Sequence, residues 1–163
     1  MKRFACLILT FCLIFTGCSV SGDRIKEPVL FYYVFEDYEK DMEQVIVSEV
    51  REAAGHRNDI SYLLALYSMG PSNEDLKSPL PRNTRIALLE HNADNMVLSL
   101  SDAVLNITEA EFTLACACIS MTCMELTDVQ QITVTCGDRT ITMQRDHLLL
   151  NDNMVQIPQE ETK

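Results

Sequence analysis

Residues 58–101 read NDISYLLALYSMGPSNEDLKSPLPRNTRIALLEHNADNMVLSLS, and this stretch decides the fold. Its first part has apolar side chains at the i, i+3, i+4 and i+7 spacing of one helix face, at Ile60, Leu63, Leu64 and Tyr67. Asn58 or Asp59 can cap the start of this helix, and Gly70 followed by Pro71 ends it. The predicted helix therefore needs a partner against which its apolar face packs.

The second part of the same stretch predicts an ordered loop and then a β-hairpin. Three prolines lie in the loop between residues 70 and 81: Pro71, Pro79 and Pro81. Their rings fix φ and cannot donate hydrogen bonds to a helix or a sheet. Residues 84–89 and 96–101 then alternate around the small polar residues 92–95, which tolerate the backbone angles of a short reversal. No catalytic or ligand-binding motif lies in residues 58–101.

The amino terminus predicts an export signal with a lipid-attachment site. Lys2 and Arg3 precede an apolar run that is short for a membrane span, and Gly17-Cys18 follows it directly. This arrangement resembles a bacterial lipobox, in which cleavage before the cysteine exposes it for lipidation. We therefore expect a signal peptide at 1–17, lipid on Cys18 and a polar tether at 18–27. An ordinary signal peptide with an incidental cysteine and an uncleaved anchor helix remain alternatives.

The charge balance argues against nucleic acid as a partner. Removal of the signal peptide takes Lys2 and Arg3 from the 13 basic residues and leaves 11 against 24 acidic ones, two charges more negative than the −11 of the whole chain. Such a surface repels phosphate backbones and anionic headgroups. Membrane attachment should therefore come from acyl chains at the extracytoplasmic face of the cell membrane, while a basic protein partner is compatible with the charge.

The rest of the chain predicts further strands and one long helix. Residues 29–35 indicate a central strand buried on both faces, and 44–50 a strand that runs into a turn of helix stopped by Gly55. Thr108 and Glu111 form a capping box before a long apolar helix. Its stripe consists of Phe112, Ala115, Cys116, Ile119, Cys123 and Leu126. The final strands are expected at residues 131–136 and 139–143, around Gly137-Asp138.

Together these elements predict an α+β fold, with one domain at 28–145 and a tail at 146–163. We expect the order β-β-α-β-β-α-β-β, with two main helices on one face of a mixed or antiparallel sheet. The threonine-rich last strands indicate that the other face meets solvent. That open face, or an edge strand, is where another protein could bind.

The sequence offers no clear reacting centre. Cys116 and Cys118 point about 200° apart on a helix with 100° per residue, so they do not form one metal site with Cys123. A disulfide from Cys136 to Cys116 or Cys123 remains open.

The remaining polar residues favour ordinary surface roles. Residues 36–43 are acidic but lack the glycine and ligand order of a calcium loop. The histidines are scattered, and Asp138-Arg139 and Asp146-His147 are interpreted as surface pairs. We predict no enzyme activity, no catalytic residue, no metal and no cofactor.

Several segments in order resemble the GerMN domain, the sporulation and spore germination domain of bacterial lipoproteins. They are LFYYV at 30–34, the helix ending in MGP at 69–71, LKSPLPRNT at 76–84, LSLS at 98–101 and VQQITVTCG at 129–137. The resemblance implies structural roles for Gly70, Pro71, Pro79, Pro81, Leu100 and Ser101. The chain departs from the family pattern in having one domain copy and Cys136 where an acidic residue is common.

The resemblance also implies a function. The GerMN domain is similar to the ring-building domains of the channel between mother cell and forespore, and it has no accepted catalytic residues. We therefore expect a lipid-anchored scaffolding module that binds envelope proteins of the sporulation or germination machinery, and it could form homo-oligomers. One alternative is a small-ligand-binding lipoprotein with a pocket lined by Tyr32, Tyr33 and Tyr67. The other alternative is a cell-wall enzyme.

Overall fold

The structure is a computed structural model that describes residues 26–37 and 45–148. Its elements are β1 (Pro28–Phe35), β2 (Ile46–Glu52), α2 (Ile60–Ser68), β3 (Leu76–Lys77), β4 (Ile86–His91), β5 (Asn95–Leu100), η2 (Asp102–Asn106), α3 (Glu109–Leu126), β6 (Gln131–Cys136), β7 (Arg139–Gln144) and α4 (Arg145–Leu148). The signal peptide, Cys18, most of the tether, residues 38–43 of the acidic stretch and the tail from 149 lie outside the described residues. Within the described part of the chain, no helix is both long and apolar enough to cross a membrane.

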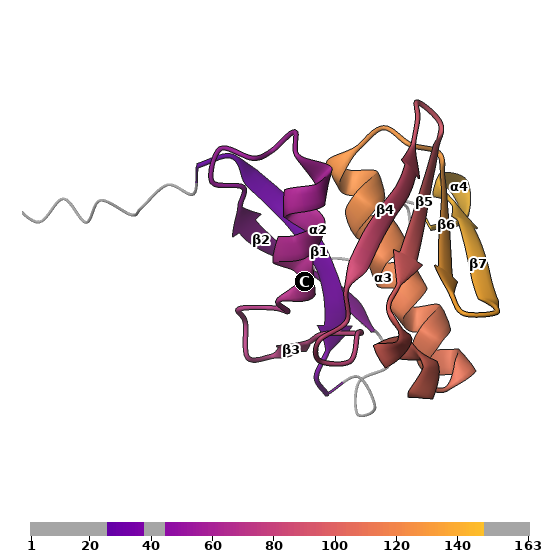
Figure 1. Ribbon diagram of the computed structural model, residues 1–163. Coiled ribbons are helices and arrows are strands. Elements are labelled where there is room, and N and C mark those ends of the chain that lie inside the picture. The colour runs from indigo at the N-terminus through magenta and orange to yellow at the C-terminus, as the bar shows by residue number, and fades with distance from the viewer. Residues whose placement is uncertain (1–25, 38–44, 149–163) are drawn as a thin grey trace, which may run out of the picture.

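The strands form two sheets, where the sequence predicted one (Figure 1). The first has the order β2-β1-β3 and is antiparallel, with β1 in the centre as predicted. The second has the order β4-β5-β6-β7 and is mixed, because β5 and β6 run parallel while both outer pairs are antiparallel. The α+β fold class and the predicted order of elements are confirmed, with β3, η2 and α4 as additions.

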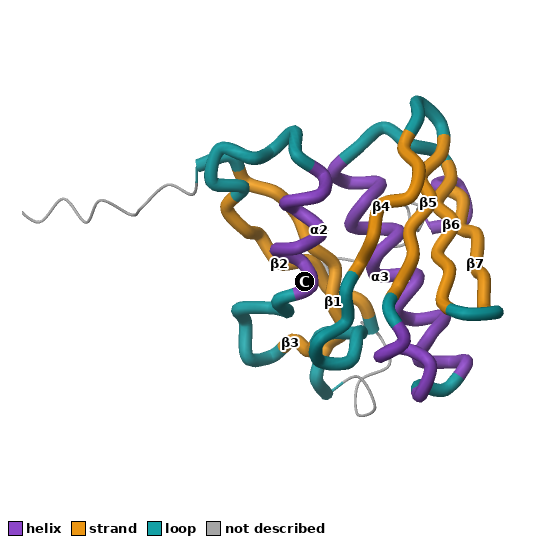
Figure 2. The backbone as a smooth tube through the Cα atoms, in the orientation of Figure 1, coloured by secondary structure: helices purple, strands orange, loops and turns teal. Residues whose placement is uncertain are grey.

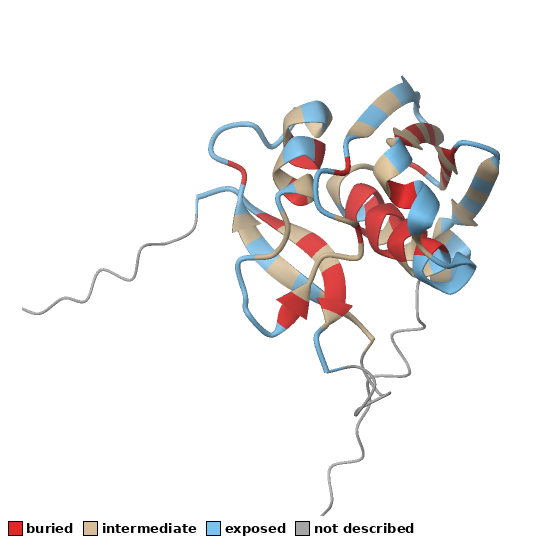
Figure 3. Cartoon of the chain, turned by 60° about the horizontal axis from the view of Figure 1, so that its bottom comes forward, coloured by how far each residue is buried: buried red, intermediate tan, exposed pale blue. Residues whose placement is uncertain are grey.

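Helix α3 lies between the two sheets (Figures 1 and 3). The strands therefore form one sheet on each side of this helix in place of the single predicted sheet. Its buried residues surround much of the helix: Phe112, Ala115, Cys116, Cys118, Ile119, Ser120, Thr122, Cys123 and Met124. On one side, the Thr122 hydroxyl accepts a hydrogen bond of 2.9 Å from the backbone N–H of Tyr32 in β1. On the other, α3 packs against β6 and β7. A helix that is apolar nearly all round can serve both sheets at once.

The capping box at the start of α3 is present as predicted. The Thr108 hydroxyl oxygen accepts from the Glu111 backbone N–H at 3.2 Å, and the Glu111 carboxylate accepts from the Thr108 backbone N–H at 2.8 Å. The Thr108 donors also lower the pKa of the Glu111 carboxyl. Two local side chains therefore satisfy the first orphan donors of the helix and fix where it begins.

Helix α2 packs on β1 through aromatic side chains. Asp59 caps it by accepting from the Tyr62 backbone N–H at 3.0 Å. Tyr67 stacks on Tyr33 with ring centroids 5.0 Å apart and meets the edge of Phe31 at 5.7 Å. All three rings are buried, so the amphipathic face predicted from residues 58–101 packs on the first sheet.

Two local predictions differ from the structure. Strand β2 continues to Glu52 and leads into turns, without the predicted turn of helix. Ala54 and Gly55 have φ of 50° and 82°, so the chain turns through consecutive left-handed residues. The predicted loop 70–81 contains the short strand β3, which pairs with Val34 and Phe35 because its residues lie between the prolines (Figure 2).

Candidate functional site

The outward side of β5, β6 and β7 in the four-stranded sheet presents an uncharged surface, and Glu90 of β4 lies opposite Val97 at its border. On β5, β6 and β7 we define this outer face as Asn95, Val97, Ser99, Gln131, Thr133, Thr135, Thr140, Thr142 and Gln144. The register places them in rows, such as Val97 beside Thr133 and Thr133 beside Thr142. None carries a charge, although charged residues make up 23% of the chain. Depletion of charge is typical of the centre of protein interfaces.

The threonine hydroxyls of the outer face are held in place by the sheet itself. Thr133 and Thr142 share a hydrogen bond of 3.0 Å between their hydroxyl oxygens. The Thr135 hydroxyl donates to the Leu98 carbonyl oxygen at 3.2 Å. These three hydroxyls of the uncharged outer face are therefore already ordered, which lowers the conformational entropy that a partner must remove on binding.

Strand β7 forms an edge of this sheet that the described strands leave unpaired. It pairs with β6 from Arg139 to Gln144 without a register shift. The opposite edge, β4, has an irregularity between Leu88 and Glu90 and lies against α2. Bulges and charges protect edge strands from pairing with other chains. Of the two edges, β7 is the one without a bulge, and no strand of the described ranges pairs with its outer side.

Two arginines fix the ends of β7 on the helix behind it. The Arg139 guanidinium lies 4.3 Å from the centre of the Phe112 ring and donates to the Ile107 and Val104 carbonyls of the η2 region. Its ion pair is with Glu109 at 3.6 Å, so the predicted Asp138-Arg139 surface pair is wrong. The sequence reasoning missed this role because the partners lie some 30 positions away.

Arg145 fixes the other end of β7 on helix α3. It donates to the Met124 and Thr127 carbonyls at the end of α3, at 2.6 and 2.9 Å, and to Val129 at 3.1 Å. A cation near a helix C-terminus satisfies carbonyls that the helix leaves without partners. Both ends of the edge strand are thus anchored, and the edge keeps a defined position.

Residues around Gly70, which the resemblance singles out, contact β2 and a neighbouring loop. Gly70 has φ of 89° and its carbonyl accepts from the Arg51 guanidinium at 3.0 Å. Glu49 pairs with Arg51 at 3.2 Å and accepts from the backbone N–H groups of Ser72 and Asn73, both at 2.8 Å. Pro71 lies between these contacts, half-buried. Gly70 ends α2 in the left-handed conformation that favours glycine.

The other residues that the resemblance singles out lie in two places. Leu100 is buried in the core, and the hydroxyl oxygen of Ser101 accepts from the Arg85 backbone N–H at 3.0 Å. Pro79 and Pro81 are half-buried and line a shallow groove of about 300 Å³ near Ile107.

The cysteines of α3 and β6 are buried free thiols in this structure. Burial raises the pKa of Cys116, Cys118 and Cys123 from 9.0 to about 12. Cys136 also contributes to the raised pKa of Cys116, and both Cys118 and Cys123 contribute to the raised pKa of Tyr67. Protonated, buried thiols are poor nucleophiles. Within residues 26–37 and 45–148, no group of three His, Cys, Asp or Glu is placed to hold a metal.

Of the three tyrosines that a ligand pocket would need, Tyr33 and Tyr67 are part of the core and Tyr32 is half-buried. The Tyr33 hydroxyl donates to the Tyr67 carbonyl at 3.2 Å, and the Tyr67 hydroxyl donates to the Tyr32 carbonyl at 3.1 Å. Burial raises the pKa of Tyr67 well above 10.0. Neither of the two open pockets described here is lined by Tyr32, Tyr33 or Tyr67.

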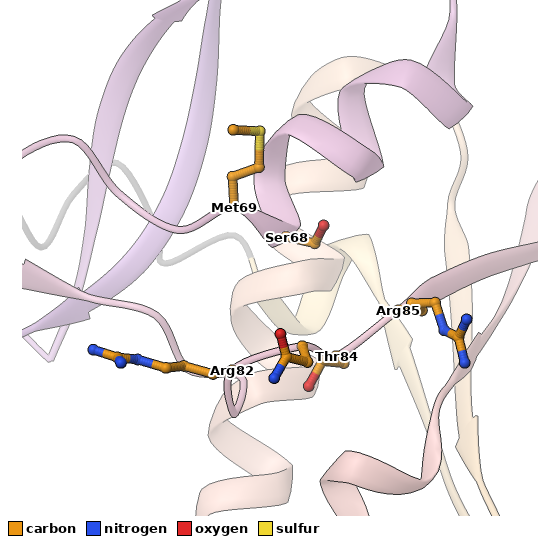
Figure 4. Close-up of a pocket in the computed structure, with 6 residues that line it drawn as sticks. Ser68, Met69, Arg82, Thr84 and Arg85 are labelled. Carbon is orange, nitrogen blue, oxygen red and sulfur yellow. The ribbon is translucent and has the colours of Figure 1, made fainter.

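The larger of these pockets is an open hollow of about 690 Å³ beside the end of α2 (Figure 4). It is lined by Ser68, Met69, Arg82, Asn83, Thr84 and Arg85. Sequence reasoning did not single out this group. Its members come from two segments that only the tertiary structure brings together.

Comparison with solved structures identifies the fold. Over 76% of this chain and 43% of the other, it superposes on the tandem GerMN domains of the sporulation protein GerM from Bacillus subtilis, with a TM-score of 0.51 and 17% identity. The first GerMN domain of that protein alone gives a TM-score of 0.49 and 9% identity, over 70% of this chain and 85% of that domain. This chain therefore spans less than half of the tandem structure. No protein-family model and no curated protein matches the sequence. The domain has a GerMN-like fold.

Proposed function

We propose that this protein is a lipid-anchored, extracytoplasmic and non-enzymatic module that binds envelope proteins during spore formation or germination. The GerMN-like fold, which also occurs in a sporulation protein, supports the setting. The leader ending in Gly17-Cys18 supports the anchor. Partners bind at the outer face and along β7.

The observation that carries this proposal is the combination of an uncharged, ordered face with an open edge. Protein partners can extend a sheet by adding a strand to its edge, and the adjoining face then supplies side-chain contacts. Strand β7 offers a continuous backbone edge, and Thr140, Thr142 and Gln144 present uncharged side chains beside it. A second copy of the chain could use the same edge.

The interaction is tested by placing a charge at this edge. Thr142→Lys puts a lysine on β7, where lysine disfavours strand addition. Ser48→Lys is the matched control, because Ser48 is an exposed strand residue on the edge of the other sheet. In sporulating cells, Thr142→Lys should reduce co-purification of envelope proteins and spore yield towards the deletion phenotype, while Ser48→Lys should not.

The setting and the anchor have their own tests. Normal sporulation and germination after deletion of the gene would contradict the proposed role. Cys18→Ser should release the protein from the membrane fraction, and the intact mass of the membrane-extracted protein should include lipid at Cys18. An unmodified amino terminus at Cys18 would refute the anchor without affecting the proposed interface.

A further inference from the structure

Two exposed arginines of this acidic protein have no partner within the described ranges. Arg82 and Arg85 make no side-chain hydrogen bond or ion pair there. The other four arginines of these ranges are engaged, either with a carboxylate or with backbone carbonyls, namely Arg51, Arg57, Arg139 and Arg145. In a chain with a net charge of −11, two cations left without carboxylates form a local site whose sign is opposite to that of the whole surface.

The backbone that carries these arginines is fixed. The backbone N–H and the hydroxyl of buried Thr84 donate to the Pro81 carbonyl, at 3.2 and 2.8 Å, and close a turn. Asn83 is the third residue of that turn and has φ of 66°. The third position of a type II turn requires such a positive φ. Two hydrogen bonds join the backbone of Arg85 to Ser101. The Arg85 N–H donates to the Ser101 hydroxyl oxygen, and the Ser101 N–H donates to the Arg85 carbonyl oxygen, both at 3.0 Å. The two guanidinium groups thus extend from a rigid base.

An exposed apolar side chain lies beside them. Met69 follows α2 and is 79% exposed. It lines the same hollow of about 690 Å³ as Arg82 and Arg85. Methionine and arginine are both enriched in protein interfaces. The hollow combines an apolar contact with two cationic ones.

The direction of the arginines limits what can bind. In Figure 4 the side chains of Arg82 and Arg85 extend to opposite sides of Thr84. One phosphate or one carboxylate therefore does not meet both guanidinium groups. A ligand that satisfies both must carry two anionic groups some distance apart, with apolar material near Met69. A long polyanion or an anionic membrane would in addition be repelled by the net charge of −11 of the whole chain.

We propose that Met69, Arg82 and Arg85 form a docking site for an acidic segment of a partner protein. Its spaced carboxylates pair with the two guanidinium groups, and an apolar side chain between them contacts Met69. None of these three residues belongs to the outer face or to β7 as defined above. The docking site is therefore tested by different variants from those that test the proposed function.

The experiment is site-specific photo-crosslinking in the native cells with the full-length chain. A photoreactive amino acid replaces Met69, whose exposed position after α2 tolerates substitution. The crosslinked peptide is then sequenced. We expect a protein segment with at least two Asp or Glu residues close to an apolar residue. A crosslink to lipid, to nucleic acid or to a segment without carboxylates would overturn the proposal, as would the absence of any crosslink.

A matched pair of charge reversals makes the test specific. Arg85→Glu and Lys26→Glu change the net charge equally, and Lys26 is also exposed but lies next to β1. Arg85→Glu should lower the crosslink yield at least about ten-fold, because a like charge then faces the partner carboxylate. Lys26→Glu should leave the yield unchanged. Equal loss in both variants, or loss in neither, would contradict the docking site, whereas the Thr142→Lys result concerns only β7.

Discussion

At the scale of single residues, Gly70 is the position whose backbone most clearly requires glycine. An added Cβ would have room, since the nearest atom is the Ser78 Cβ at 3.9 Å, but φ is 89°. Gly70→Ala should therefore lower the free energy of unfolding by about 1–2 kcal/mol through backbone strain alone. Urea unfolding followed by circular dichroism measures this. Ser72→Ala, in the same loop, should have almost no effect, and an unchanged Gly70→Ala would refute the strain.

Removal of two different hydroxyls of α3 should change the stability of the protein in opposite directions. Ser120 is buried and its hydroxyl has no hydrogen-bond partner within the described structure, so Ser120→Ala should stabilise the protein by up to about 1 kcal/mol. Thr122→Val keeps the shape but leaves the Tyr32 N–H without its acceptor, and should cost about 1–3 kcal/mol. Thermal unfolding of both variants tests this. Destabilisation by Ser120→Ala would mean that its hydroxyl has a partner.

At the scale of elements, Arg145 joins the end of α3 to β7. Arg145→Met keeps much of the apolar length but removes three hydrogen bonds to backbone carbonyls. We expect the free energy of unfolding to fall by about 2–4 kcal/mol, since hydrogen bonds to charged groups are worth more than neutral ones. Arg85→Met is the control, because Arg85 makes no such bonds, and should change stability by less than about 0.5 kcal/mol. Equal losses in urea unfolding would refute the anchoring role.

At the scale of the whole molecule, the thiols buried between the two sheets predict a loss of stability at high pH. Their pKa values rise from 9.0 to about 12 on folding, so their contribution is fully present below pH 9.0 and is lost as the pH rises towards 12. Each thiol then lowers the free energy of unfolding by up to about 1.4 kcal/mol per pH unit. Urea unfolding between pH 8 and pH 10 measures the slope. Cys123→Ala should reduce this slope, and a stability independent of pH would contradict the burial of the thiols.

The sequence by itself determined the elements whose causes are local. The capping box of Thr108 and Glu111, the Asp59 cap and the reversal at Gly137 each act within a few residues, so α2, α3, β6 and β7 were predicted close to their observed bounds. The α+β class followed from that order. The resemblance to the GerMN domain also came from short local segments, and the fold confirms it.

Only the tertiary structure decided which faces of these elements pack against one another. The stripe on α3 shows that the helix is buried but not that two sheets lie against it, because periodicity does not identify the partner of a face. The parallel pairing of β5 and β6, and the anchoring of Arg139 and Arg145, join residues far apart in the chain. The same holds for Arg82 and Arg85. The sequence gives only the net charge of the whole chain. Whether a particular arginine lies beside a carboxylate depends on where the fold places both side chains.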